Sequence, residues 1–343
     1  MAERTEISSL GEFGLIEHLT KNIELQNASS VVGIGDDGAV IDHFGKQTVV
    51  TTDLLIENVH FDLVYTPLKH LGYKSVVVNL SDVYAMNATP TQITLSLGIS
   101  NRFSVQALDE FYEGVYTACE NYGVDLVGGD TTSSQKGFII SVTAIGEVSP
   151  DKFVKRNTAK KGDLLCVSGT LGSAYVGLLF LEREKKIYLE SPGVQPDLEG
   201  ESFVIGKLLK PEARKDIVDF FEQQSLLPTA MMDISDGLSS EILHICKESE
   251  LGCVIYEEKI PIADEMRNAA FKFKIDPTAC ALSGGEDYEL LFTISQNDYD
   301  KITLNENISV IGYMTEADAG SQLITKSGNK HPITAQGWNA LAK

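Results

Sequence analysis

Residues 71–99 read LGYKSVVVNLSDVYAMNATPTQITLSLGI and contain two periodicities in succession. Small and apolar residues recur every three or four positions over 71–86, which predicts a helix. Over 93–99 every second residue is a large aliphatic one, which predicts a strand with one buried face. A helix followed directly by a half-buried strand is typical of a chain whose helices pack against a sheet.

The same two patterns continue on both sides of this stretch. Further helices are predicted over 105–122 and 238–249, and the polar segment 190–201 is predicted to be a loop. β-Branched or alternating runs predict further strands at 47–53, 138–148, 164–168, 252–256, 288–294 and 308–313. The mixture predicts an α/β or α+β chain.

Length and composition predict two domains of a globular protein. The chain has 343 residues, and a domain commonly takes about 150. A polar, basic stretch over 149–163 is the candidate boundary, which predicts an N-terminal domain over 1–149 and a C-terminal domain over 150–343. The 43% of hydrophobic residues fits a folded chain.

The charge balance excludes several classes of partner. The chain has 28 Lys and Arg against 49 Asp and Glu, a net charge of −21. Nucleic acids and anionic membrane surfaces require cationic patches, so neither is an expected partner. The sequence lacks an apolar run of about 18 residues and shows no signal-peptide pattern at its start. We therefore expect a cytoplasmic protein.

The five cysteines agree with that location. Their number is odd and no C-x-x-C pair occurs, which argues against a disulfide framework or a zinc ribbon. Free cysteines commonly act as small buried hydrophobic residues in a reducing compartment. We expect that role for all five.

The acidic residues that stand out adjoin glycine, serine, threonine or apolar residues, with almost no Lys or Arg nearby. They are Asp36, Asp37, Asp53, Asp82, Asp130, Asp233, Asp236, Glu286 and Asp287. A turn or helix N-cap explains any one such aspartate. Carboxylates that converged without basic partners would repel one another, and Mg²⁺, which prefers oxygen ligands, would remove that repulsion.

Other common sites find little support. Gly33-x-Gly35-x-x-Gly38 matches the dinucleotide fingerprint, but two aspartates occupy its variable positions and a strand–turn–strand pattern follows it. The sequence contains no P-loop, EF-hand or G-x-S-x-G motif. The histidines are scattered, so a nucleophilic triad is not expected.

Seven motifs in order resemble the thiamine-monophosphate kinase family, within the aminoimidazole ribonucleotide synthetase-like superfamily. The resemblance runs from about residue 11 to residue 338. The motifs are Gly33-Ile-Gly-Asp-Asp-Gly-Ala39, Thr51-Thr-Asp53, Asn58-Val-His-Phe61, Val78-Asn-Leu-Ser-Asp82, Gly128-Gly-Asp-Thr-Thr132, Asp233-Ile-Ser-Asp-Gly-Leu238 and Leu282-Ser-Gly-Gly-Glu-Asp-Tyr-Glu-Leu290.

The resemblance implies an N-terminal sheet domain that forms a homodimer and a C-terminal α/β domain. It also implies ATP-dependent phosphorylation of thiamine phosphate to thiamine diphosphate with several Mg²⁺ ions. The implied metal ligands or their neighbours are Asp37, Thr51, Thr52, Asp53, Asp82, Asp130, Asp233 and Asp236. The implied ATP contacts are Gly129, Asp130, Arg156 and Ser235, and the implied thiamine phosphate contacts are His60, Glu286 and Trp338. Asp53, Asp130 and Arg156 are the expected catalytic residues.

The expected chemistry is physically consistent with these residues. Two anionic phosphates must meet in an acidic protein, and bound Mg²⁺ would convert the site into a positive cradle. The acceptor phosphate is already ionised, so no general base is required and direct in-line transfer is expected. The planar fork of Arg156 suits a phosphate.

Three alternatives remain at this stage. One is a ligase like aminoimidazole ribonucleotide synthetase, and another is a relative of the hydrogenase maturation protein. The latter has a terminal cysteine, whereas the last cysteine here is Cys280. The third is a non-catalytic acidic metal-binding module.

Overall fold

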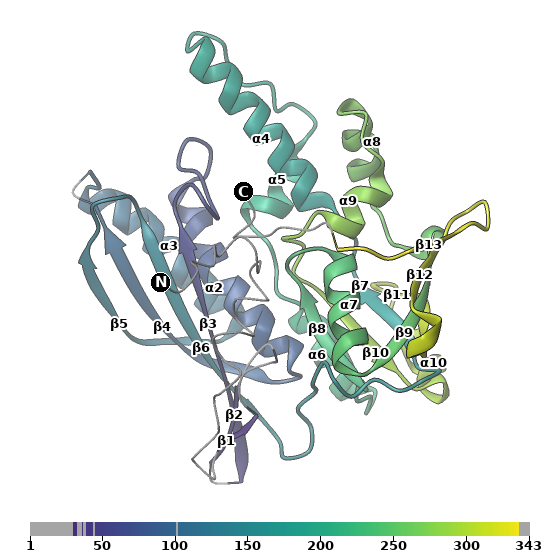
Figure 1. The fold of residues 1–343 in the computed structure, drawn as a ribbon. Helices are drawn as coiled ribbons and strands as arrows, with labels where there is room; N and C mark the ends of the chain where they lie inside the picture. The colour runs from purple at the N-terminus through teal and green to yellow at the C-terminus, as the bar shows by residue number, and fades with distance from the viewer. Residues whose placement is uncertain (1–29, 33–35, 37–38, 44, 101, 336–343) are drawn as a thin grey trace, which may run out of the picture.

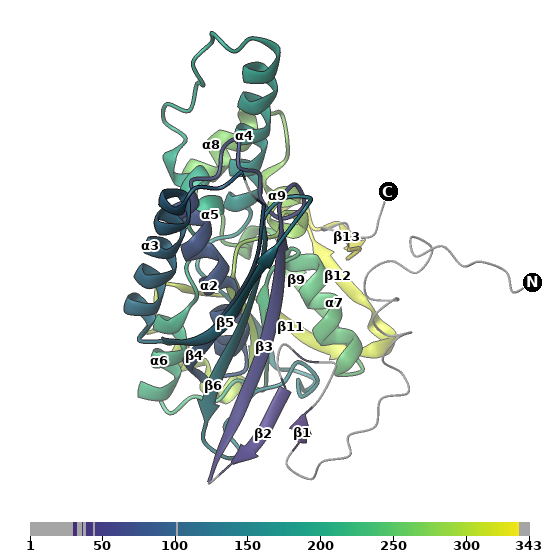
Figure 2. The ribbon, with the colours of Figure 1, turned by 90° about the vertical axis from the view of Figure 1, so that its left-hand side faces the viewer.

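The computed structural model describes residues 30–32, 36, 39–43, 45–100 and 102–335. Its first half is a six-stranded sheet with two helices on one face (Figures 1 and 2). The strand order is β1-β2-β3-β6-β4-β5, and only β4 and β5 are parallel neighbours. The elements are β1 (Ser30–Val32), β2 (Ala39–His43), β3 (Lys46–Ile56), α2 (Leu68–Ala85), β4 (Thr89–Ile99), α3 (Val105–Tyr122), β5 (Asp125–Ser133) and β6 (Ile139–Val148).

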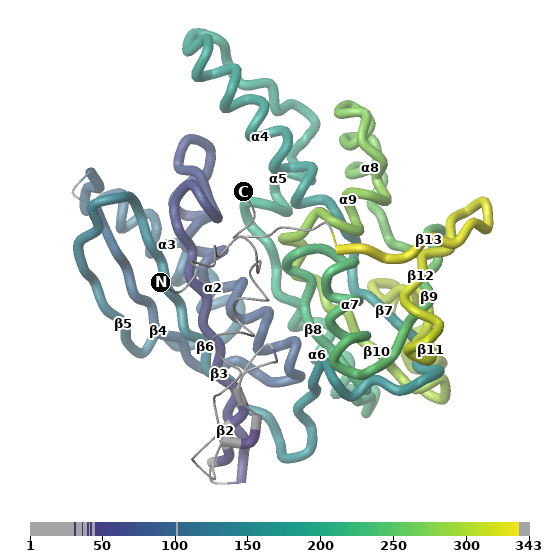
Figure 3. Tube along the Cα trace, viewed as in Figure 1, coloured from purple at the N-terminus to yellow at the C-terminus, as the bar shows by residue number. Residues whose placement is uncertain are grey.

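The second half is a seven-stranded sheet flanked by helices, and Figure 3 shows that the chain enters it only after leaving the first sheet. Its strand order is β13-β12-β9-β11-β7-β10-β8. The strands are β7 (Leu164–Ser168), β8 (Ala230–Ile234), β9 (Leu251–Tyr256), β10 (Glu289–Ile294), β11 (Ile308–Glu316), β12 (Ser321–Ile324) and β13 (Lys330–Pro332). The helices are α4 (Ser173–Glu190), α5 (Ser202–Leu209), α6 (Lys215–Gln223), α7 (Leu238–Glu248), α8 (Asp264–Lys272), α9 (Pro277–Ser283) and α10 (Tyr299–Ile302). The mixed α/β class is confirmed.

Helix α2 joins the two halves. It contacts β3, β4 and β6 of the first sheet and β8 of the second, so nearly every residue from Leu71 to Ala85 is buried. One core runs from the first sheet through this helix to Phe221 and Phe292 of the second half. A helix buried on all sides carries polar residues only where they find partners. Two polar residues of α2 reach the second half in this way, because Lys74 donates to the carbonyl of Leu208 and the Ser81 hydroxyl donates to Asp233.

Helices α2 and α3 cross at two glycines. A Cβ atom at Gly72 would clash with the backbone carbonyl of Phe111, and one at Gly114 would clash with the carbonyl of Lys69. This close contact fixes α2 against α3.

Most predicted elements are present, and several of them begin or end at other residues than expected. Strand β3 continues to Ile56, beyond the expected end at Asp53, because Leu55 and Ile56 keep pairing with β6. Strand β10 begins at Glu289, because Tyr288 has a left-handed backbone with φ of 51°. Asp53 therefore lies inside a strand.

Two further expectations concern membrane-spanning helices and the cysteines. No helix in the described ranges is long and apolar enough to cross a membrane. All five cysteines are free, and four of them are buried. Their expected role as small buried side chains is confirmed for Cys166, Cys246, Cys253 and Cys280, whereas Cys119 is partly buried.

Candidate active site

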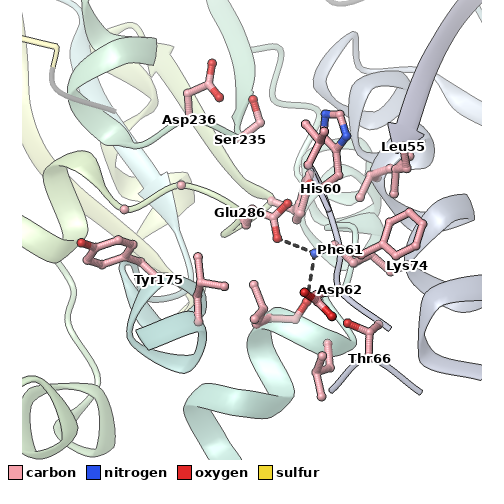
Figure 4. A pocket seen from close by; sticks show the side chains of 18 of the residues that line it. Leu55, His60, Phe61, Asp62, Thr66, Lys74, Tyr175, Ser235, Asp236 and Glu286 are labelled. Carbon is pink, nitrogen blue, oxygen red and sulfur yellow. Dashed lines mark hydrogen bonds and ion pairs between the residues drawn. The ribbon is translucent and has the colours of Figure 1, made fainter. Parts of the chain in front are cut away.

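A cavity of about 960 Å³ lies where the two halves meet (Figure 4). The first half contributes β3, the loop up to Thr66 and one face of α2. The second half contributes α4, the end of α5, the segment after β8 and the loop between α9 and β10. Seven residues expected at the site line this cavity, namely Asp53, His60, Asp82, Asp233, Ser235, Asp236 and Glu286.

One face of α2 supplies three lining residues. Lys74, Val78 and Asp82 are four residues apart, and all three line the cavity. Positions i and i+4 lie above one another on a helix. The helix therefore places a cation at one end of the cavity and a carboxylate at the other.

The acidic end is built from three elements. Asp53 comes from β3, Asp82 from α2 and Asp233 from β8. The Thr51 hydroxyl donates to Asp82 Oδ2 at 2.7 Å, and the Ser81 hydroxyl donates to Asp233 Oδ2 at 2.6 Å. These donors fix the carboxylates in place without neutralising them.

The carboxyl groups at this end affect one another. Burial and the neighbouring Asp233 raise the pKa of Asp53 to about 6. Burial likewise raises the pKa of Asp233, against the opposing influence of the Ser81 hydroxyl and the Arg156 charge. A bound cation would stabilise both ionised groups.

A fourth acid lies behind this end of the cavity. Glu241 of α7 is 2% exposed, and its Oε1 accepts the backbone N–H of Asp236 at 3.0 Å. Its Oε2 is buried and has no hydrogen-bond partner among the residues that the structure describes. Burial and the charges of Asp236 and Asp233 raise the pKa of Glu241 well above its usual value.

The acids do not form a closed metal site by themselves. Across the described ranges, no three His, Cys, Asp or Glu side chains lie close enough together to hold an ion. Mg²⁺ commonly binds one or two protein carboxylates and completes its shell with water and substrate phosphates. The carboxylate oxygens at the acidic end, which face the cavity, fit that type of coordination.

The opposite end of the cavity is held by ion pairs. Lys74 pairs with Glu286, and Lys185 of α4 pairs with Asp62 at 2.6 Å. The Tyr65 hydroxyl donates to Glu182 at 2.8 Å. The last two contacts connect the loop after β3 to α4, so this end is closed by links between the halves.

The loop that carries Glu286 has a constrained backbone. Gly285, Glu286 and Tyr288 all have left-handed φ angles, of 79°, 60° and 51°. Glu286 N–H donates to the carbonyl of Ser235 at 2.6 Å. Residues held in this region commonly mark functional loops, because the surrounding structure must compensate for their strain.

His60 and Asp287 have different roles in this region. His60 Nδ1 accepts the backbone N–H of Ile56 at 3.0 Å, which leaves Nε2 of the neutral ring as a donor. Asp287 is buried and accepts the N–H of Gly172 at the start of α4. Burial raises the pKa of Asp287 to about 7.

Several expected site residues lie away from the cavity. Gly129 and Asp130 are exposed on β5, which is separated from β3 by β6 and β4. The Thr52 hydroxyl donates to the carbonyl of Val142. Arg156 forms an ion pair with Asp36 at 3.3 Å. Asp37 and Trp338 lie outside the described residues.

Sequence reasoning missed several ionisable residues at the site, among them Asp62, Lys74, Glu182, Lys185 and Glu241. Lys74 could have been found from the sequence, because it lies two steps of four residues before Asp82 on the predicted helix. Glu241 could have been suggested by its position five residues after Asp236. Asp62 and Lys185 are 123 positions apart in the sequence and only the fold brings them together.

Comparisons with known proteins agree with this fold. Residues 35–148 match the family "AIR synthase related protein, N-terminal domain". The thiamine-monophosphate kinase of Aquifex aeolicus is 39% identical over 287 residues, covering 84% of this chain and 87% of that protein. The enzyme of the same name from Bacillus subtilis is 31% identical, covering 94% and 99%.

A solved structure described as "AaThiL complexed with AMPPCP and TMP" has a TM-score of 0.82 and 33% sequence identity to this chain. The match covers 98% of this chain and 99% of the other. Similarity over nearly the full length of several relatives establishes the family. The chain therefore belongs to the thiamine-monophosphate kinase family and is a kinase.

Proposed function

We propose that this enzyme transfers the terminal phosphoryl group of ATP to thiamine monophosphate, giving thiamine diphosphate and ADP. The observation that carries the proposal is the cavity between the halves, acidic at one end and closed by ion pairs at the other. The relative whose solved structure is described as complexed with AMPPCP, an ATP analogue, and TMP supports the same pair of substrates.

The transfer is direct and in line. A phosphate oxygen of thiamine monophosphate forms a bond to the γ-phosphorus, the bond from that phosphorus to the β–γ bridging oxygen breaks, and ADP leaves with the electron pair. Cys280 lines the cavity, but burial raises its pKa to about 11. A thiol with that pKa is a poor nucleophile at neutral pH, which favours transfer without a phospho-enzyme.

The acidic end would bind more than one Mg²⁺. The proposed ligands and their neighbours are Asp37, Thr51, Thr52, Asp53, Asp82, Asp130, Asp233 and Asp236. When bound, the ions would neutralise the phosphate oxygens that approach one another. The protein fixes Asp82 through Thr51 and Asp233 through Ser81, so these carboxylates are preorganised before substrates arrive.

The remaining expected residues are assigned to the two substrates. Ser235 lines the acidic end and would contact ATP together with Gly129, Asp130 and Arg156. His60, Glu286 and Trp338 would contact thiamine monophosphate. The charge of Arg156 reaches Asp233 and opposes the rise in the pKa of that buried carboxyl group. That proximity supports a role for Arg156 beside the phosphates.

The position of Asp130 favours a homodimer in which each copy contributes to its partner's site. Strand β5 is at the edge of its sheet, and Leu54 and Val127 are 51% and 58% exposed. An unpaired edge and exposed aliphatic residues favour association of two sheets. Light scattering at micromolar concentration should give twice the chain mass, and a monomer would exclude this arrangement. The free cysteines favour the cytoplasm as the compartment.

The deciding experiment is a product assay. The enzyme is incubated with ATP, Mg²⁺ and thiamine monophosphate, and with unphosphorylated thiamine as the control acceptor. ADP and thiamine diphosphate should form in equal amounts from the monophosphate, with no product from thiamine. Ping-pong kinetics or a trapped phospho-protein would contradict direct transfer.

A further inference from the structure

Lys74 is a buried cation whose role the expected site residues leave open. Its side chain is 5% exposed. Its ammonium donates to the carbonyl of Leu208 at 3.2 Å and pairs with Oε2 of Glu286. Burying a lysine is costly unless it is paired. The pairing therefore needs an explanation at this position in the molecule.

The ion pair joins three segments around the cavity. Lys74 comes from α2, Glu286 from the loop after α9, and Leu208 from α5. Figure 4 shows Lys74 and Glu286 facing one another at the cavity wall. The Glu286 side chain is 31% exposed, so it stands between the buried ammonium and the cavity.

Lys74 controls the direction of the Glu286 carboxylate. The backbone of Glu286 is fixed by its left-handed φ and by its bond to Ser235, but the side chain has several rotamers. Lys74 engages Oε2, which leaves Oε1 available to a ligand in the cavity. An ionised acceptor fixed in this way suits a donor such as the exocyclic amine of an aminopyrimidine.

The pair is separated from the acidic end. Asp82 lies eight residues after Lys74 on the same helix, and eight residues span about 12 Å. The charge of Lys74 therefore acts mainly on Glu286 rather than on the carboxylates around Asp53. Replacing Lys74 should therefore weaken the binding of one substrate and leave the binding of the other unchanged.

We propose that Lys74 is a positioning residue that holds Glu286 against the organic part of thiamine monophosphate and so determines acceptor specificity. The proposal rests on the proposed function, because it assigns the organic part of the acceptor to the end of the cavity opposite the acids. Lys74 itself acts through Glu286 and not on the reacting atoms.

The test is a double-mutant cycle with Lys74→Met, Glu286→Gln and the combination, together with Lys74→Arg. Lys74→Met should raise the KM for thiamine monophosphate about tenfold or more, the scale of a lost charged hydrogen bond. The KM for ATP should stay within about twofold. Lys74→Arg should restore most of the affinity, and the double variant should be no worse than Glu286→Gln alone.

Lys272→Met is the control, since Lys272 likewise pairs with a glutamate, Glu201, but away from the cavity. It should leave both KM values unchanged. Losses that add in the double variant, or equal losses for both substrates, would overturn the proposal. A lower melting temperature of Lys74→Met with an unchanged KM would show a purely structural role.

Calorimetric binding of thiamine monophosphate separates this proposal from the proposed function. A wild type that binds thiamine monophosphate but forms no thiamine diphosphate would contradict the function alone. In that case, weaker binding of thiamine monophosphate by Lys74→Met than by the wild type would still support the positioning role. A wild type that fails to bind thiamine monophosphate would overturn both.

Discussion

The carboxylates at the two ends of the cavity have different partners. Asp82 and Asp233 at the acidic end accept hydrogen bonds from hydroxyl groups, whereas Glu286 and Asp62 at the opposite end are paired with lysines. Hydroxyls orient a carboxylate and leave its charge, while lysines cancel it. The protein thus keeps negative charge where cations and phosphates would bind and neutralises the end assigned to the organic part of the acceptor.

The difference also predicts how each end responds to change. Removing one acid should relieve repulsion at the acidic end, whereas removing one partner at the opposite end leaves a buried charge unpaired. The same chemical change should therefore stabilise one end and destabilise the other.

Asp53→Asn should lower the maximal rate by about 10²-fold or more, the scale expected when a preorganised charge at the transferring phosphoryl group is lost. The fold should survive, because the neighbouring Asp233 loses a repelling partner. Steady-state kinetics and circular dichroism check both parts. Asp300→Asn, an exposed change away from the cavity, should leave the rate unchanged. A fully active Asp53→Asn would remove Asp53 from the site.

The metal-free protein should lose stability as the pH rises from 5 to 8. Asp53 and Asp287 have folded-state pKa values of about 6 and about 7, both raised from 3.8. A raised pKa means that the folded state binds the proton more tightly, so the contribution is complete below pH 3.8 and disappears as the pH passes the folded value.

Melting curves in EDTA should show this trend, with a smaller decline for Asp53→Asn. At pH 8 the variant should be more stable than the wild type by roughly 2 kcal/mol. This value follows from the rise in the pKa of Asp53 from 3.8 to about 6, and it is reduced because the Asp53 side chain is partly exposed. At pH 5 the advantage should be smaller. An equal effect at both pH values would mean that the charge of Asp53 has no part in it.

Glu241→Gln should have the smallest effect. The amide keeps an acceptor for the backbone N–H of Asp236 and removes a buried charge beside Asp236 and Asp233. We expect a gain of about 1 kcal/mol or less at pH 8 in the metal-free protein and none at pH 5. Thermal melts at the two pH values measure it. A loss of stability at pH 8 would show that the ionised form of Glu241 has a partner.

Sequence patterns predicted the elements with clear periodicity and missed those without it. The alternation over 93–99 and the helical spacing over 105–122 both correspond to the observed β4 and α3. Helices α5, α6, α8 and α9 were not expected, because each has only seven to nine residues. So few turns give a weak periodic signal.

The acidic end of the site could be predicted and the opposite end largely could not. Acids beside glycine and serine stand out in a sequence, and Asp53, Asp82, Asp233 and Asp236 all line the cavity. The partnership of Lys74 with Glu286 spans 212 positions, and local patterns contain no information on such pairs. Lys74 also lies in a largely apolar helix, and in the sequence a lysine there is expected to be exposed to solvent. Only the packing of the second half against α2 shows that it is buried.

The most direct test of the account is the rate as a function of free Mg²⁺ at saturating ATP and thiamine monophosphate. An acidic end that keeps its charge for cations requires more Mg²⁺ than the ion that accompanies ATP, because one ion binds only one or two carboxylates. The rate should continue to rise after all ATP is chelated, and Asp53→Asn should shift that rise to higher Mg²⁺. A wild-type rate that saturates at one Mg²⁺ per ATP would contradict the account.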